Sequence, residues 1–225
     1  MIVSIHQPNY IPWIGFFNKI LSSDVYVVFD DIQFPRGKDY ANRNQIKTNN
    51  GKTWLTIPVI GKSDLKPWNQ IGINKNGWID KHLAIIESFY TKSPYFKEYY
   101  SEIKNIYLKD HNLLIDLTLD LIRHFIKIFD KKTKIILSSD IKTDLKGMDK
   151  ILYILKYLQA TKYISGDGDG SKRYIDENLF KENNIELIWQ NYKHPTYNQQ
   201  FGEFIPYMSI LDLLFNEGPN SKNII

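Results

Sequence analysis

Cysteine is absent from this chain of 225 residues. Its absence excludes disulfide bonds, thiolate metal sites and a cysteine nucleophile. No apolar run reaches the length of a membrane span, and no charged segment precedes an apolar one in the manner of a signal peptide. We therefore expect a protein that is neither exported nor membrane-spanning, with the cytoplasm as its location. Because repeats, low-complexity tracts and linkers are also missing, a single domain over residues 1–225 is the simplest prediction.

A strong charge of one sign is missing too. Lys and Arg total 29, Asp and Glu total 25, and the formal net charge is +4. The lysines are scattered among acids, and the one tight basic run, at residues 131–134, is short. A nucleic-acid-binding surface would gather basic residues on one face. This pattern favours a solvated surface, is compatible with a small anionic substrate such as a nucleotide, and disfavours nucleic acid, although an aminoacyl-tRNA donor stays open.

Motifs for metal or triad chemistry are lacking as well. The chain contains five histidines, which are not clustered, and neither HExxH nor a Ser-His-Asp arrangement occurs. Asp167 and Asp169 resemble the start of a calcium loop, but the glutamate at its twelfth position is missing. We therefore expect no metal site and no zinc. Aromatic residues, in contrast, make up 14% of the chain, and we expect part of this surplus to line a cleft.

The hydrophobic pattern predicts a βαβ unit at the N-terminus. Residues 2–7 and 25–29 are short apolar runs typical of buried strands, and residues 16–21 between them have helical spacing. Residues 134–190 repeat the alternation as β-α-β-α-β. This alternation predicts an α/β fold, a Rossmann-like and largely parallel sheet with helices on both faces. A mainly helical insertion is expected at about 78–130.

Polar residues follow the first two predicted strands. His6 and Gln7 end the first strand, and Asp30 and Asp31 end the second. In open α/β sheets, ligands bind outside the carboxyl ends of the strands, where the strand order reverses. Asp also favours the turns that end strands, so a purely structural role is an equal alternative for the acids. The candidate catalytic residues are His6, Asp30 and Asp31, any of which could be the base.

A stiff turn joins the first strand to the helix. Pro8 and Pro12 restrict its backbone, whereas Gly15 permits close approach of another group. The helix N-terminus beyond it offers unpaired N–H groups and a positive dipole end to a phosphate. Aromatic side chains in the turn provide flat faces for a base or a sugar. The candidate substrate contacts in this turn are Gln7, Tyr10 and Trp13.

Two further polar segments are candidate ligand loops. Residues 42–47 place Arg43, whose planar fork suits phosphate, among three side-chain amides. Residues 165–173 follow a predicted strand, and their glycines could let the backbone wrap an anion, although two acids argue against bare phosphate unless a metal or an amine is present. His194 is a candidate second titrating group beside the site. The candidates from these segments are Asn42, Arg43, Asn44, Lys47, Ser165, Gly166, Ser171, Lys172, Arg173 and His194. The residues expected to share one pocket at the sheet edge are His6, Tyr10, Asp30 and Arg43.

At these residues the sequence resembles the WbqC-like family. The matching features are His6-Gln7-Pro8-x-Tyr10-x-Pro12-Trp13-x-Gly15, Asp30-x-x-x-Phe34, Asn42-Arg43-Asn44-x-Ile46-Lys47, Trp54-Leu55-Thr56-x-Pro58-Val59, Tyr163-x-Ser165-Gly166 and Leu211-Asp212-Leu213-Leu214-Phe215-Asn216-x-Gly218-Pro219. The resemblance covers the chain from end to end. It implies a role in the biosynthesis of O-antigen, the outer part of lipopolysaccharide, or of another bacterial surface polysaccharide, as a transferase of glycine to an amino sugar. The chain departs from simpler versions of the Tyr163-x-Ser165-Gly166 loop by carrying Asp167 and Asp169, which puts phosphate contact there in doubt.

Three functions from different classes fit these features. The first is a transferase that attaches glycine or a related acyl group, taken from an activated donor, to the amine of a nucleotide-linked amino sugar. In it, Arg43 and Lys47 would hold the diphosphate. Tyr10 and Trp13 would hold the base or the sugar, and His6 or one of the two acids would deprotonate the amine. The second is a nucleotidyltransferase or amide-forming ligase that uses ATP, and the third is a non-catalytic nucleotide-sugar-binding protein. We rank them in this order.

Overall fold

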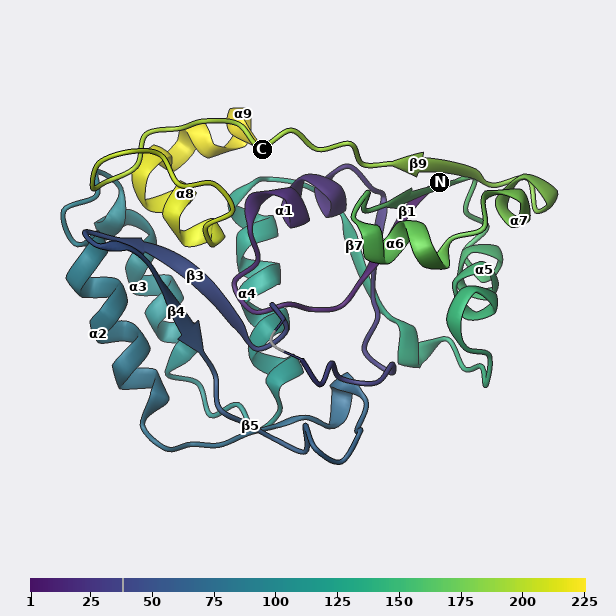
Figure 1. The fold of residues 1–225 in the computed structure, drawn as a ribbon, viewed down its shortest axis with the longest axis horizontal. Coiled ribbons are helices and arrows are strands. Elements are labelled where there is room, and N and C mark those ends of the chain that lie inside the picture. The colour runs from purple at the N-terminus through teal and green to yellow at the C-terminus, as the bar shows by residue number, and fades with distance from the viewer. Residues whose placement is uncertain (38) are drawn as a thin grey trace.

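A five-stranded parallel sheet forms the centre of the computed structural model, which describes residues 1–37 and 39–225 (Figure 1). Its strands lie in the order β7-β2-β1-β8-β9, and every neighbouring pair is parallel. The chain builds outward from β1 through β2 to β7 and then returns to add β8 and β9 on the other side. The strand order therefore reverses between β1 and β8, as in Rossmann-like folds, and the predicted fold class is confirmed. The strand bounds are β1 Ile2–His6, β2 Val25–Val28, β7 Lys134–Leu137, β8 Lys162–Ser165 and β9 Glu186–Trp189.

Helices cover both faces of this sheet. The longer ones are α1 Ile14–Leu21, α2 Trp78–Tyr90, α3 Phe96–Tyr107, α4 Leu114–Ile128, α5 Gly147–Tyr157 and α8 Ile210–Glu217. The shorter ones are α6 Asp169–Tyr174, α7 Glu177–Glu182 and α9 Ser221–Ile224, with 3₁₀ turns η1 Trp68–Gln70, η2 Ser138–Asp140 and η3 Gly218–Asn220.

Alternation along the strands decides which side chains meet which helices. Val3 and Ile5 of β1 belong to a hydrophobic cluster with α5 and α7. Tyr26 and Val28 of β2 point to the opposite face and pack in the cluster that contains α1 and α4. Because side chains alternate along a strand and His6 pairs in register with Val28, His6 lies on the α1 face.

A second half of the molecule, on the left in Figure 1, contains α2, α3 and α8 around a β-hairpin. The hairpin pairs β3 Arg43–Thr48 with β4 Gly51–Thr56, and a smaller antiparallel pair joins β5 Val59–Ile60 to β6 Gly72–Ile73. Helices α2 to α4 span residues 78–128, where the sequence predicts a helical insertion. The largest hydrophobic cluster includes side chains of α1, α4 and α8, so the core continues from the sheet into this half. Among the helices of the described residues, none is long and apolar enough to cross a membrane.

Candidate active site at the strand-order reversal

Two adjoining cavities lie at the carboxyl ends of β1 and β8, where the strand order reverses. The first, the α1 cavity, has a volume of about 370 Å³ and lies between α1 and the glycine-rich turn at residues 166–170. The second, the α5 cavity, has a volume of about 500 Å³ and is lined largely by apolar side chains of α5 and its neighbours. His6, Gly170 and Ser171 line both cavities. The predicted location of the site, beyond the end of the first strand, coincides with these cavities.

His6 stands at the junction of the two cavities. Its Nδ1 lies 2.9 Å from the carbonyl oxygen of Gln7, and because a carbonyl only accepts, Nδ1 carries the proton and Nε2 keeps a free lone pair. The edge of the ring meets Phe16 of α1 at a centroid distance of 5.1 Å. Burial, reinforced by the charge of Lys19, lowers the pKa of His6 to about 3. His6 is therefore neutral at pH 7, an acceptor at Nε2 and not a cation that holds phosphate.

Lys19 is a candidate site residue that sequence reasoning missed. It lines the α1 cavity, is only 4% exposed, and takes part in no hydrogen bond or ion pair with the described part of the chain. Burial lowers the pKa of its ammonium group to about 7. The available signal was helical spacing, because Lys19 follows the buried Phe16 by three residues and precedes the buried Ile20. A lysine on the apolar face of a short helix is uncommon in a simple core position.

The predicted turn residues divide between the two cavities. Gln7 and Ser165 line the α5 cavity, Gly166 lines the α1 cavity, and Ser171 lines both. Ser165 is buried, and its hydroxyl donates to the carbonyl oxygen of Gly166. Lys172 and Arg173 of α6, in contrast, are exposed and line neither cavity. The structure therefore supports the glycine-rich turn as part of the site but not the two basic residues that follow it.

An aromatic wall bounds the α1 cavity. The ring of Trp13 lines the cavity and stacks on His194, with centroids 6.1 Å apart and planes 9° from parallel. Nδ1 of His194 donates to the carbonyl oxygen of Pro195, and Nε2 accepts from the backbone N–H of Tyr207. Burial lowers the pKa of His194. Both nitrogens of His194 are engaged, so this residue supports Trp13. The prediction from the sequence that His194 is a free titrating group is therefore corrected.

Gly15 explains why this wall can form. A Cβ atom built on Gly15 would lie 2.1 Å from the ring of Trp13, far closer than any real contact. The ring of Trp13 thus packs directly on the backbone of α1. The sequence prediction that Gly15 permits close approach is confirmed, but the approaching group is a side chain of the same turn.

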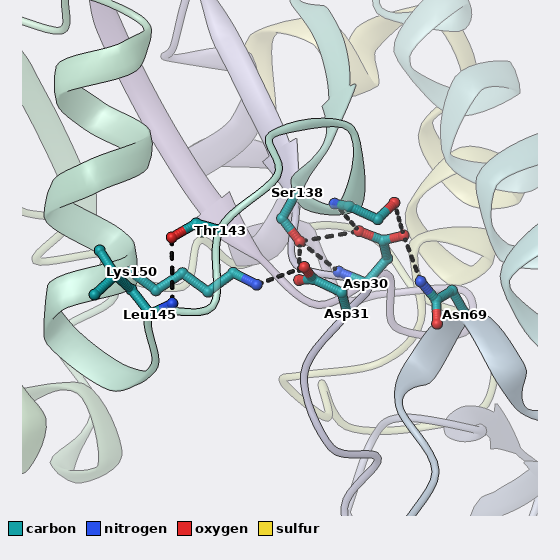
Figure 2. A network of polar contacts seen from close by, with 8 residues as sticks. Asp30, Asp31, Asn69, Ser138, Thr143, Leu145 and Lys150 are labelled. Carbon is teal, nitrogen blue, oxygen red and sulfur yellow. Dashed lines mark hydrogen bonds and ion pairs between the residues drawn. The ribbon is translucent and has the colours of Figure 1, made fainter.

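Asp30 is the centre of a buried hydrogen-bond network (Figure 2). It lines neither of the two cavities. Its Oδ1 accepts from the hydroxyl of Ser138 and the backbone N–H of Ser139, at 2.9 Å each. Its Oδ2 accepts from the hydroxyl of Ser139 at 2.6 Å and from the amide of Asn69 at 3.3 Å. Each of the two carboxylate oxygens of Asp30 thus accepts two hydrogen bonds. Asp30 ties the end of β2 to η2 and η1, so the interpretation of Asp30 as the base is replaced by a structural one.

Asp31 points the other way, toward α5. Figure 2 shows Lys150 of α5 reaching its carboxylate, and the Nζ–Oδ2 distance is 2.5 Å. The hydroxyl oxygen of Ser138 also lies 2.5 Å from Oδ1 of Asp31, so its single proton is shared between the two carboxylates. Asp31 and Lys150 line a third cavity of about 550 Å³, which shares Ile32 and Gly147 with the α5 cavity. Asp31 therefore lies beside the site without reaching His6, and an ion pair already engages its carboxylate.

Tyr10 lines neither the α1 cavity nor the α5 cavity. It is fully buried, and its hydroxyl contacts Nδ1 of His82 at 2.9 Å and the hydroxyl of Tyr107. Nε2 of His82 donates to the carbonyl oxygen of Thr56 at 3.2 Å. This network satisfies the phenol inside the core, which a buried tyrosine requires. The expectation that His6, Tyr10, Asp30 and Arg43 share one pocket is therefore wrong.

Residues 42–47 support the scaffold and line neither the α1 nor the α5 cavity. The amide of Asn42 donates to Ile57, and that of Asn44 donates to the carbonyl oxygen of Ile11 in the proline-rich turn. Arg43 lies over the ring of Trp54 at 3.9 Å. Lys47, in turn, donates to the carbonyl oxygen of Glu203 at 2.5 Å. The amide of Asn44 holds the turn that carries the candidate site and that of Asn42 binds the backbone at Ile57, which corrects their interpretation as substrate ligands. Within the described residues, no group of three or more histidines or acids lies together as a metal site would require.

Comparisons with known proteins agree with the motifs. The model of the WbqC-like protein family matches residues 7–224. A protein of Mycobacterium tuberculosis (strain ATCC 25618 / H37Rv), named Uncharacterized protein Rv1507c, is 32% identical over 226 residues, which cover 99% of this chain and 96% of that relative. No solved structure gives a significant match. Because the family model and the relative both extend over nearly the whole chain, this protein belongs to the WbqC-like protein family.

Proposed function

We propose that the protein is a transferase that attaches glycine or a related acyl group to the amine of a nucleotide-linked amino sugar. The family resemblance suggests the biosynthesis of O-antigen or another surface polysaccharide as its setting, and we place the activity in the cytoplasm. The observation that carries the proposal is the neutral imidazole of His6 at the junction of two cavities, at the strand-order reversal. Nucleotide-binding α/β folds place their ligands at such a point.

The two cavities differ in the chemistry of their linings, and a nucleotide-linked sugar has parts that match each lining. The α5 cavity presents Phe29, Ile151 and Tyr174, apolar or aromatic side chains that suit a nucleobase. The α1 cavity presents Lys19 and the ring of Trp13, which suit an anionic group and the face of a sugar. Each volume lies within the range of small-molecule sites. A ligand spanning both cavities would pass His6.

His6 has the role of proton acceptor in this proposal. A neutral amine attacks the acyl carbon, the new C–N bond forms, and the bond from that carbon to its carrier breaks. The carrier leaves with the electron pair of that bond, and the proton lost by the amine passes to Nε2 of His6. The hydrogen bond from Nδ1 to Gln7 fixes the ring with Nε2 free for this step.

A second function is favoured by one observation, the amino group of Lys19 beside the glycine-rich turn. This pairing also fits an ATP-using nucleotidyltransferase or an amide-forming ligase, in which the α1 cavity would hold phosphates. Binding of ATP separates this function from the first. A non-catalytic nucleotide-sugar-binding protein would use the same cavities without turnover.

Thermal shift with UDP- and dTDP-linked amino sugars, and with ATP, tests the proposal. We expect the amino sugars to raise the melting temperature, and His6→Gln to abolish aminoacylation of the bound sugar while retaining that shift. His111→Gln is the matched control, because His111 pairs with Asp120 outside the two cavities. A shift by ATP alone would favour the ligase. No shift with any of these ligands, or full activity of His6→Gln, would contradict the proposed transferase.

A further inference from the structure

Lys19 has a buried side chain, and burial lowers the pKa of its amino group to about 7, so this group is only partly protonated at neutral pH. Lys19 is 4% exposed, and no hydrogen bond or ion pair engages its amino group within the described residues. Lysine is rarely buried in this way, because removing an ammonium ion from water is unfavourable unless a counter-charge replaces the water. The buried Lys150 shows the usual solution in the same protein, an ion pair with Asp31 at 2.5 Å. Lys19 lines the α1 cavity, so its amino group, unlike that of Lys150, is available to a partner that is not part of the chain.

The walls of the α1 cavity define what this partner can be. Lys19 brings an amino group that is partly protonated at pH 7 and Asp167 brings one negative charge, whereas His6 is neutral at pH 7. The backbone of the glycine-rich turn is open, because a Cβ atom at Gly168 or Gly170 would meet nothing within 4 Å. The cavity therefore offers one amino group that a bound anion would keep protonated, one hydrogen-bond-accepting carboxylate and free space above an exposed backbone.

We propose that Lys19 binds a phosphate oxygen of a diphosphate group in the α1 cavity, and that Asp167 accepts a hydrogen bond from a hydroxyl or amine beside that phosphate. The inference rests on the proposed function, for which it specifies the position of the diphosphate. An anion supplies the counter-charge that Lys19 lacks. A bare diphosphate would meet repulsion from Asp167, whereas a diphosphate joined to an amino sugar carries donors that a carboxylate can accept.

This site is coupled to His6 through charge. Burial is the main cause of the lowered pKa of His6, and the positive charge of Lys19 is the second. An anion bound to Lys19 offsets that charge and removes the second cause, so the pKa of His6 rises on binding. Asp167 is the other charged group that lines the α1 cavity with His6, and its negative charge acts in the same direction as the anion. The diphosphate would thus make His6 a better proton acceptor once the substrate is in place.

Calorimetric titration with inorganic pyrophosphate and with UDP tests the site. We expect Lys19→Gln, which removes the charge at similar length, to weaken binding of both probes by roughly 10-fold or more. Lys156→Gln on the exposed face of α5 is the matched control and should bind as the wild type does. Asp167→Asn should bind pyrophosphate more tightly, because it removes the repulsion, but should bind a UDP-linked amino sugar more weakly.

The outcomes separate this inference from the proposed function. Pyrophosphate binding that depends on Lys19 in a protein without transferase activity would retain the site and refute the transferase. Transferase activity combined with equal pyrophosphate binding by Lys19→Gln and the wild type would refute the site alone. Absence of pyrophosphate and UDP binding by the wild type would also overturn it. Because the substitution removes a buried charge, Lys19→Gln should fold, and circular dichroism should verify this before titration.

Discussion

Replacing Asp30 tests the division between scaffold and site. Asp30 is 1% exposed, and its carboxylate accepts four hydrogen bonds, from Ser138, Asn69 and two groups of Ser139. Asp30→Ala removes the acceptor and leaves these donors without a partner in a buried region. We therefore expect a large loss of stability and no specific loss of ligand binding.

The size of the effect follows from the contacts. Each buried donor left unsatisfied costs about 1–3 kcal/mol, but neighbouring losses are not additive and water can enter part of the space. We expect the free energy of unfolding to fall by about 3–5 kcal/mol in Asp30→Ala. In a chain of this size, about 1 kcal/mol shifts the melting temperature by roughly 2–4 °C, so the shift should be on the order of 10 °C. Asp30→Asn keeps one oxygen acceptor and should lose less.

Urea denaturation followed by circular dichroism measures the stability, and nucleotide-sugar titration at low temperature measures binding by the folded fraction. Asp116→Ala is the matched control, because Asp116 is exposed on α4 and its loss should change stability by about 0.5 kcal/mol or less. Two results would refute the reasoning. One is an Asp30→Ala variant as stable as the control, and the other is a folded variant that binds substrate normally but has lost activity, as expected of a catalytic acid or base.

Four further predictions concern the site and the core. His6→Ala should lower the rate by on the order of 10²-fold or more while changing stability by about 1 kcal/mol, which an aminoacylation assay beside thermal melting would show. In an NMR titration, His6 should stay neutral from pH 8 to pH 5. Lys19→Met should raise the pKa of His6, because the repelling charge is gone. An unchanged pKa of His6 in that variant would contradict the coupling. Burial lowers the pKa of His82 to about 4, whereas its pKa in the unfolded chain is about 6.5. The contribution of neutral His82 to stability is therefore complete above pH 6.5 and is lost as the pH falls toward 4, by up to about 1.4 kcal/mol per pH unit. Urea denaturation at several pH values should show a flatter pH dependence of stability for His82→Gln. Gly15→Ala should displace the ring of Trp13 and destabilise the protein by about 1–3 kcal/mol, which tryptophan fluorescence and thermal melting would show. Gly37 has open space around it, so the control variant Gly37→Ala should melt as the wild type does.

Local patterns in the sequence were sufficient for the fold class, and they placed the candidate site at the end of the first strand, where the structure has two cavities. Apolar runs separated by helical spacing indicate parallel strands with crossover helices, and the structure contains that sheet. His6 became a candidate because the end of a first strand in such a fold faces the ligand crevice. The glycine-rich turn was found for the same reason. These inferences depend only on residues that are neighbours along the chain.

Tertiary structure decided which side chains face the cavities. Tyr10 and Trp13 occupy the same turn and are both aromatic, yet Tyr10 is fully buried against α2 and α3 while Trp13 lines the α1 cavity. Asp30 and Asp31 are adjacent acids, yet η2 and η1 enclose only Asp30. Lys19 was missed because its importance comes from the empty space opposite α1. Packing between segments far apart in the sequence decides which of these side chains are buried and which face a cavity. The residues of one segment do not show which other segment will pack against it.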